Sequence, residues 1–269
     1  MSEVEAVVFD CDGVLVDITS SWQQIHNYFG TNNKENLAKF LEKEITDDEF
    51  MELDVKLWLD IQDKIHMDEI MRCFSGVKLM KGAREVITEL KRRGIYVAIV
   101  SSGVARFIGS IAHILKVDDW AANDFAWDED GYLSGPKSAM VDSHDKGEMV
   151  DKLLRINGFQ ASKIWTVGDS GTDLSMRIPD SNFIGFNPAR ERSMNEFTKA
   201  NVGSAPTPPA ATFSWSWWAA WKPGARPPRS ARRAATHSAK TWTLPPSSAR
   251  NTCASSCGRP TSSGPMPSN

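Results

Sequence analysis

The stretch Val7-Val8-Phe9-Asp10-Cys11-Asp12-Gly13-Val14-Leu15-Val16-Asp17 decides the fold of this chain. Its apolar run ends in two carboxylates, Asp10 and Asp12, with a glycine behind them. Open α/β sheets place their sites at the carboxyl ends of buried strands, and this order predicts such a strand. Two acids separated by one residue can take different roles in the same reaction. One can act as nucleophile or bind a metal, and the other can transfer a proton.

Further along the chain, strand-like and helix-like patterns alternate. Apolar runs predict strands, and amphipathic runs predict helices. The expected strands are residues 5–9, 95–100, 164–167 and 182–186, and the expected helices are 83–93, 106–115 and 146–156. A β-hairpin is expected over 125–133, with its turn at Asp130-Gly131. The pattern predicts an α/β fold with a doubly wound, mainly parallel Rossmann-like sheet and right-handed crossovers.

The long interval between the first two strands predicts an inserted helical cap. Residues 22–74 carry Leu, Ile and Met at helical spacing, and Thr46-Asp47-Asp48-Glu49 is a good helix start. This block is too long for one crossover, so it is interpreted as a subdomain over the strand ends. The expected domains are a core of 1–17 and 80–203, a cap of 18–79 and a tail of 204–269.

The tail differs in composition from everything before it. Residues 204–269 contain no Asp, Glu, Val, Ile or Tyr, but hold most of the prolines and half of the tryptophans. Such a composition is typical of disorder. Two hypotheses stay open: a basic, Trp-containing arm for an acidic partner, or out-of-frame translation of a GC-rich gene beginning near residue 203.

Whole-chain properties narrow the class of protein. A net charge of −3 gives no reason to expect nucleic acid or an anionic membrane as partner, and no apolar run could cross a bilayer. The acidic N-terminus leads directly into a strand and is not expected to be a signal peptide. The cysteines Cys11 and Cys73 lie far apart, and Cys253 and Cys257 have no second pair. Neither a disulfide framework nor a metal site is expected from them, and a reducing cytoplasm fits best.

Polar clusters follow three expected strands. They are Asp10 with Asp12, Ser101 with Ser102, and Asp169 with Asp173. Each cluster alone also fits a turn or a helix cap. Together they would meet at one edge of a parallel sheet, where four carboxylates repel one another unless a hard cation such as Mg²⁺ lies between them. With the cation of Lys146 and the hydroxyl of Ser101 nearby, the set suits a phosphate dianion.

These segments resemble, in order, the four signature motifs of the haloacid dehalogenase superfamily. The spacing is most similar to its phosphoserine phosphatase-like branch. The segments that carry the resemblance, besides residues 7–17, are Val100–Gly103, Asp145–Glu148 and Gly168–Met176. The resemblance covers roughly residues 5–200 and does not include the tail.

The resemblance implies a role for each matching residue. Asp10 would be the nucleophile that forms an aspartyl-phosphate, and Asp12 the acid that protonates the leaving alcohol and then activates water. Dehalogenases of the superfamily lack this second acid. Mg²⁺ would be held by Asp10, the Asp12 backbone carbonyl and Asp169, with Asp173 close by. The phosphoryl oxygens would be bound by Ser101, Ser102 and Lys146.

The resemblance also implies a function, but it does not settle the substrate. The expected activity is Mg²⁺-dependent hydrolysis of a small phosphorylated metabolite. Thr19 stands where phosphoserine phosphatases carry a glutamate for the substrate ammonium, and Lys56 and Arg72 are the candidates for a carboxylate-binding cation. A phosphatase of another sugar or carboxylate phosphate, and a non-catalytic phosphate-binding or regulatory protein with a damaged C-terminus, stay open as alternatives. The oligomeric state is left open.

Overall fold

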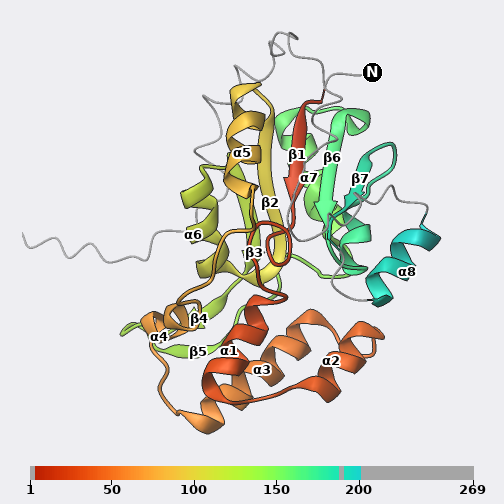
Figure 1. Ribbon diagram of the computed structural model, residues 1–269. Coiled ribbons are helices and arrows are strands. Elements are labelled where there is room, and N and C mark those ends of the chain that lie inside the picture. The colour runs from red at the N-terminus through yellow and green to blue at the C-terminus, as the bar shows by residue number, and fades with distance from the viewer. Residues whose placement is uncertain (1–3, 188–190, 201–269) are drawn as a thin grey trace, which may run out of the picture.

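The computed structural model describes residues 4–187 and 191–200, and its centre is a five-stranded parallel sheet (Figure 1). The order across the sheet is β3-β2-β1-β6-β7. The strands are β1 (Ala6–Phe9), β2 (Tyr96–Val104), β3 (Asp119–Asn123), β6 (Ile164–Gly168) and β7 (Asn182–Gly185). This topology confirms the doubly wound α/β fold. Because β1 is central and β6 is beside it, the segments after Phe9 and Gly168 leave the sheet side by side.

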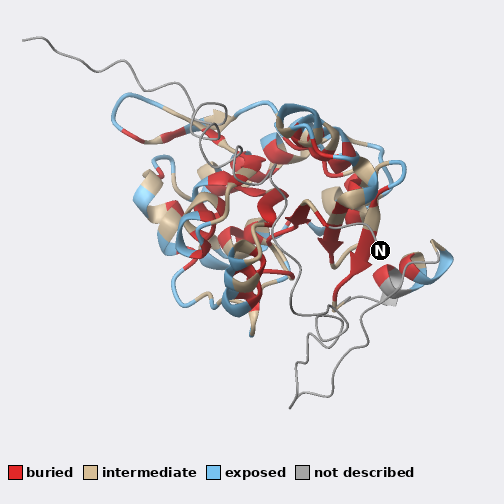
Figure 2. Ribbon diagram, turned by 90° about the horizontal axis from the view of Figure 1, so that it is seen from above, coloured by how far each residue is buried: buried red, intermediate tan, exposed pale blue. Residues whose placement is uncertain are grey.

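Helices cover both faces of the sheet because its strands are apolar on both sides. Val7 and Phe9 of β1 pack into one hydrophobic cluster, and Ala6 and Val8 pack into a second. The first cluster includes side chains of α5 (Ala83–Arg92) and α6 (Ala105–Leu115), and the second includes those of α7 (Lys146–Asn157). In the view from above, the strands are buried almost throughout (Figure 2). A sheet buried on both faces gives the site a rigid base.

A group of helices lies beyond the carboxyl ends of the strands, where the cap was expected (Figure 1). They are α1 (Ser21–Phe29), α2 (Lys34–Leu41), α3 (Asp47–Ile61) and α4 (Met67–Arg72). Thr46 forms the expected capping box with Glu49 at the start of α3. The hairpin of β4 (Phe125–Trp127) and β5 (Leu133–Pro136) adjoins these helices, since Leu133 N donates to Ile65 O at 2.8 Å.

The sheet departs from the sequence expectation at two places. Strand β2 continues to Val104 instead of ending at Val100, and an irregularity in its pairing with β3 lies between those residues. Strand β3 was not expected, because Asp119-Trp120-Ala121-Ala122-Asn123 contains no β-branched residue. Pairing with β2 and burial decide its conformation instead.

The remaining described elements are the short helices Ala161–Lys163 and Thr172–Met176 and the helix α8 (Glu191–Lys199). No helix among the described residues is long and apolar enough to cross a membrane. The tail, including Cys253 and Cys257, lies outside the described residues, so the expectations for residues 204–269 stay predictions.

Candidate active site

Asp10 stands directly after the central strand and is almost fully buried. Its amide donates to Val167 O at 2.8 Å, which extends the pairing of β1 with β6 by one residue. The chain then turns tightly, because the carbonyl of Cys11 accepts from three successive amides that begin at Val14. Gly13 has a φ of 78°, and a Cβ there would lie 2.6 Å from Oδ2 of Asp169. Glycine is therefore required where the two acidic loops meet.

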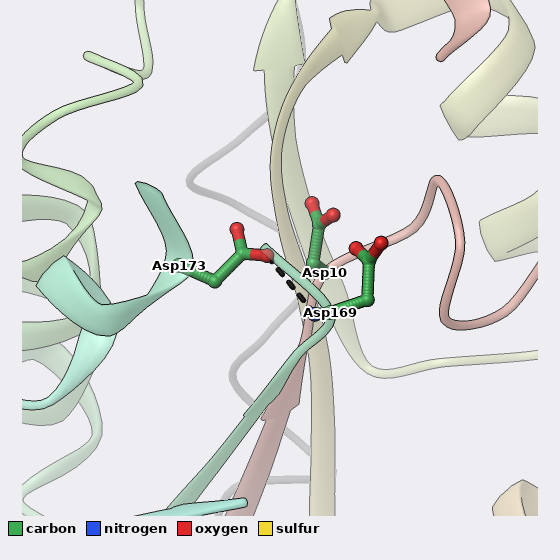
Figure 3. Close-up of side chains that lie close together, drawn as sticks. All are labelled: Asp10, Asp169 and Asp173. Atoms are coloured by element: carbon green, nitrogen blue, oxygen red, sulfur yellow. Dashed lines mark hydrogen bonds between the residues drawn. The ribbon is translucent and has the colours of Figure 1, made fainter. Parts of the chain in front are cut away.

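Lys146 joins two of the acids that the sequence placed on different strands. Its Nζ lies 3.0 Å from Oδ1 of Asp10 and 2.6 Å from Oδ1 of Asp173. The side chains of Asp10, Asp169 and Asp173 point toward a common space at the strand ends (Figure 3). We call Asp10, Asp12, Lys146, Asp169 and Asp173 the core cluster.

The core cluster is crowded with negative charge. Burial raises the pKa of Asp10 to about 7; Lys146 opposes this shift, and Asp173 adds to it. Burial also raises the pKa of Asp169 to about 9, with Asp173 and Asp10 adding to the effect. Burial alone would lower the pKa of Lys146, but Asp10 and Asp173 outweigh it and raise that pKa. One lysine therefore does not balance these carboxylates.

The donor set fits a hard divalent cation. One carboxylate oxygen from each of Asp10, Asp169 and Asp173 lies within 4.8 Å of the others. Carboxylate oxygens are the ligands that Mg²⁺ prefers. Its charge would favour the ionised forms of Asp10 and Asp169, whose pKa values are raised by burial first and by the neighbouring acids second. Asp173 already uses both oxygens: Oδ1 faces Lys146, and Oδ2 accepts from the amides of Asp169 and Ser170. Asp173 therefore fixes the positions of Lys146 and of the backbone at Asp169 and Ser170, in addition to lying near a possible metal.

Asp12 lies at the junction of the core and the cap. Its Oδ2 accepts from the amide of Ser21, the first residue of α1, at 2.6 Å. Its Oδ1 is buried and has no hydrogen-bond partner. Burial raises the pKa of Asp12, while the Ser21 contacts lower it. A carboxyl group with one anchored oxygen and one free oxygen can hold and deliver a proton.

The sequence did not predict a role for Ser21 in the site. Besides its contact with Asp12, its Oγ accepts from the amide of Val104 at 3.0 Å and ties the cap helix to the end of β2. The only signal in the sequence is a Ser-Ser pair before an amphipathic run, which also describes an ordinary helix cap.

The two predicted phosphate-binding serines lie beside the carboxylates. Ser101 is buried, and its Oγ accepts from the amide of Gly103 at 3.2 Å. The backbone carbonyl of Ser102 accepts from Trp22 Nε1 at 3.0 Å, so this hydrogen bond does not involve the Ser102 hydroxyl. Both residues line the same cavity as Asp10, Asp12 and Lys146.

This cavity has a volume of about 490 Å³ and lies between the core and the cap. Thr19 lines it, together with residues of α1, α2 and α3. Lys56 and Arg72 are exposed and do not line it, so the cavity gives no support to the expectation that they contact substrate. Lys56 points away because it lies two residues from Asp54 on α3, a separation that puts side chains on different faces of a helix.

The cap contributes a second polar group that the sequence did not reveal. Its members are His26, Asn33, Asp54 and Trp58, which we call the cap cluster. His26 is buried, and its ring lies 3.0 Å from Oδ1 of Asp54. His26, Asn33 and Asp54 line the cavity. Spacing alone could not pair them, because they come from α1, the loop after it and α3.

Comparison with known proteins places this arrangement in a family. The model of haloacid dehalogenase-like hydrolases matches residues 4–178. The chain belongs to this family. The match includes every member of the core cluster and the whole of the expected cap, and it confirms the resemblance seen in the four motifs.

Named relatives of this hydrolase are phosphoserine phosphatases. The protein of Archaeoglobus fulgidus is 28% identical over 190 residues, which are 69% of this chain and 53% of that protein. The protein of Methanocaldococcus jannaschii is 26% identical over 171 residues, 63% of this chain and 79% of that protein. The chain thus spans only about half the length of the first of these relatives.

A solved structure shows the same fold. The phospho-aspartyl intermediate analogue of a phosphoserine phosphatase is 25% identical, with a TM-score of 0.55, and the match covers 74% of this chain and 99% of that one. The likeness to a phosphoserine phosphatase-like member of the family therefore holds for the fold as well as for the sequence.

Proposed function

We propose that this hydrolase is a Mg²⁺-dependent phosphatase that hydrolyses the phosphomonoester of a small metabolite. The contact between Lys146 Nζ and Asp10 Oδ1 carries the proposal. It keeps one oxygen of a buried carboxylate next to a cation, at the strand end where a phosphoryl group can approach. A nucleophile and a charge for the phosphoryl oxygens then meet in one place.

Asp10 would attack phosphorus. A bond forms between a carboxylate oxygen of Asp10 and phosphorus, and the ester bond from phosphorus to the alcohol oxygen breaks. The product on the protein is an aspartyl-phosphate. Lys146 and the Ser101 hydroxyl, with the neighbouring Ser102, would bind the phosphoryl oxygens during the transfer.

Asp12 would move the proton in both halves of the reaction. Its raised pKa favours the protonated form that can donate to the leaving alcohol oxygen. Once the alcohol has left, the Asp12 carboxylate accepts a proton from water, which attacks the aspartyl-phosphate and releases phosphate. The Ser21 amide holds Asp12 in place through both steps.

The metal would be held by Asp10, the backbone carbonyl of Asp12 and Asp169, with Asp173 alongside. When bound, Mg²⁺ supplies positive charge for the phosphoryl oxygens and for the crowded carboxylates. The other task of the protein is to exclude water, and the cap helices that line the cavity are positioned for it.

The substrate of this proposal is a small phosphorylated metabolite, with phosphoserine among the candidates because the relatives carry that name. Thr19 lines the cavity in place of the glutamate expected of that activity. This observation favours a second candidate function, hydrolysis of a sugar or carboxylate phosphate other than phosphoserine.

Turnover of p-nitrophenyl phosphate tests the proposal. We expect Mg²⁺-dependent release of nitrophenol, and a loss of about 10⁴-fold or more in Asp10→Asn, because the nucleophile is removed without a change of shape. Asp60→Asn, an exposed acid on α3, is the matched control and should keep full activity. A folded, Mg²⁺-bound sample without turnover would contradict the proposal and favour a non-catalytic phosphate-binding protein.

A further inference from the structure

A loop of the core leads from the hairpin to the lysine of the core cluster. Residues 138–144, which we call the bridging loop, lie between β5 and α7 and end two residues before Lys146. Asn123, at the end of β3, holds this loop to the core, because its Oδ1 accepts from the amides of Met140 and Val141, both at 2.9 Å. The bridging loop is therefore fixed to the end of the sheet and leads directly to the proposed phosphate-binding lysine.

The start of α3 binds the bridging loop through two carboxylates. Asp48 accepts from the amide of Ala139 at 2.6 Å and from the hydroxyl of Ser138 at 2.8 Å. Asp47 accepts from the amide and the hydroxyl of Ser143. The partners of each pair are at least 90 residues apart in the sequence. Because the helix dipole favours acids in the first turn, α3 presents charged acceptors to the core at this point.

His144 joins the bridging loop to a second helix of the cap. Its Nε2 lies 2.9 Å from the backbone carbonyl oxygen of Phe40 in α2. Since a carbonyl can only accept, Nε2 carries a proton and donates it. The two rings also pack against each other, with their centroids 5.0 Å apart, and both residues line the cavity. The cap is thus docked on this loop through α2 as well as α3.

The position of Lys146 depends on the segment that leads into it. Its amide donates to Ser175 Oγ at 3.0 Å, and its Nζ contacts Asp10 and Asp173. The side chain is buried, so it has little freedom to compensate for a shift of its backbone. A displacement of about 1 Å is enough to weaken contacts to a reacting group strongly. A change in how the cap docks on the bridging loop would therefore reach the charge that faces the phosphoryl oxygens.

We propose that Asp47, Asp48 and His144 are positioning residues through which the docked cap sets the place of Lys146. Phosphate is then bound tightly only while the cap is docked on the bridging loop. The proposal rests on the proposed function, because Lys146 is the residue that would bind the phosphoryl oxygens. Coupling between two sites is reciprocal, so bound phosphate also strengthens the contacts between the cap and the loop.

Two substitutions of His144 test its donor atom. The side-chain amide of His144→Gln can reach the place of Nε2 and keep the bond to Phe40, whereas that of His144→Asn is too short. The probe is inorganic phosphate, titrated by calorimetry into the Mg²⁺-loaded protein. We expect Kd to rise about 5- to 10-fold in His144→Asn, which loses a hydrogen bond across the junction, and less than about 2-fold in His144→Gln.

The control for these variants is His113→Asn, which changes an exposed histidine on α6 and should leave the affinity for phosphate unchanged. A Kd in folded His144→Asn that is no higher than in His144→Gln would overturn the role assigned to His144.

Variants of Asp48 test whether the effect acts through Lys146. Asp48→Ala removes both acceptors and should raise Kd for phosphate about 10-fold, whereas Asp48→Asn can still bond to Ala139 and Ser138 and should recover most of the affinity. In a Lys146→Gln background, Asp48→Ala should change Kd less than about 2-fold, because the group through which it acts is gone. An equal rise of Kd with and without Lys146 would show a purely structural effect and overturn the proposal.

Hydrogen exchange tests the reciprocal effect in the unmodified protein. Saturating phosphate should slow exchange of the amides of Ala139 and Ser143 about 5- to 10-fold, because both donate to the cap. The amide of Gly131, which donates to Asp128 O in the hairpin turn, is the control and should not change. Exchange that is unaffected at Ala139 and Ser143, or slowed equally at Gly131, would overturn the coupling.

These measurements separate the coupling from the proposed function, because neither requires turnover. Phosphate affinity that depends on His144 and Asp48 supports the coupling even if p-nitrophenyl phosphate is not hydrolysed, a result that would contradict only the phosphatase. Hydrolysis of p-nitrophenyl phosphate, with the same phosphate affinity in His144→Asn, Asp48→Ala and the unmodified protein, would contradict only the coupling.

Discussion

The core cluster and the cap cluster both bury carboxylates, but they treat the charge differently. In the core cluster, Lys146 contacts two acids, and the pKa values of Asp10 and Asp169 are still raised to about 7 and about 9. In the cap cluster, Asp54 lies 3.0 Å from the His26 ring and accepts from the side-chain amide of Asn33. The core cluster therefore gathers negative charge around one lysine at the strand ends, whereas the cap cluster holds a single acid in a network of polar side chains.

Removing the lysine of the core cluster is expected to have the largest effect. Lys146→Gln leaves Asp10 and Asp173 without their shared cation, so the free energy of unfolding of metal-free protein should fall by about 3 kcal/mol at pH 8. The loss should shrink at pH 5, where Asp10, whose pKa is raised to about 7, is protonated. Urea unfolding measures it, with exposed Lys78→Gln as control. A loss that is the same at both pH values would contradict the charge balance described for the core cluster.

The second largest effect is expected in how the stability of the protein depends on pH and on Mg²⁺ at the core cluster. An acid whose pKa is raised on folding binds more protons in the folded state, so stability falls as pH rises between its unfolded and folded pKa values. For Asp10 and Asp169 this window runs from about 4 to about 9. Mg²⁺ should therefore raise the melting temperature more at pH 8.5 than at pH 5.5. A pH-independent effect of Mg²⁺ would place its binding elsewhere.

A variant at Trp58 tests the hydrogen bonding of the cap cluster. Trp58→Phe removes the donor to His26 Nδ1. The free energy of unfolding should fall by about 1 kcal/mol, because a buried hydrogen bond is lost. Urea unfolding measures the change, and an unchanged free energy would contradict the role of Trp58 in the cap cluster.

The smallest effect is expected where the two regions join. Asp47 at the start of α3 accepts hydrogen bonds from the amide and hydroxyl of Ser143, and burial raises its pKa. Asp47→Asn keeps an acceptor, so the free energy of unfolding should change by less than about 1 kcal/mol. KM should shift equally for all substrates. A loss well above this value would show that the charge of Asp47, and not only its acceptor atoms, holds the junction.

Most of the fold and the acids of the site could be predicted from the sequence because their signals are local. A run such as Val7–Phe9 is apolar whatever surrounds it, and Asp10 follows it by covalent connection. Strand β3 had no such signal and is held by pairing with β2. Lys56 and Arg72 were candidates by charge alone, and the helix faces on which they lie keep them from the cavity.

The sequence by itself determined the parallel sheet, the helical cap and the meeting of Asp10, Asp12, Lys146 and Asp169 at one edge. The physical reason is that parallel strands present their carboxyl ends together. Only the tertiary structure decided that Ser21 anchors Asp12 and that Asp54 meets His26. Those contacts join segments whose separation in the sequence has no fixed relation to their separation in space, and they depend on how the cap helices pack.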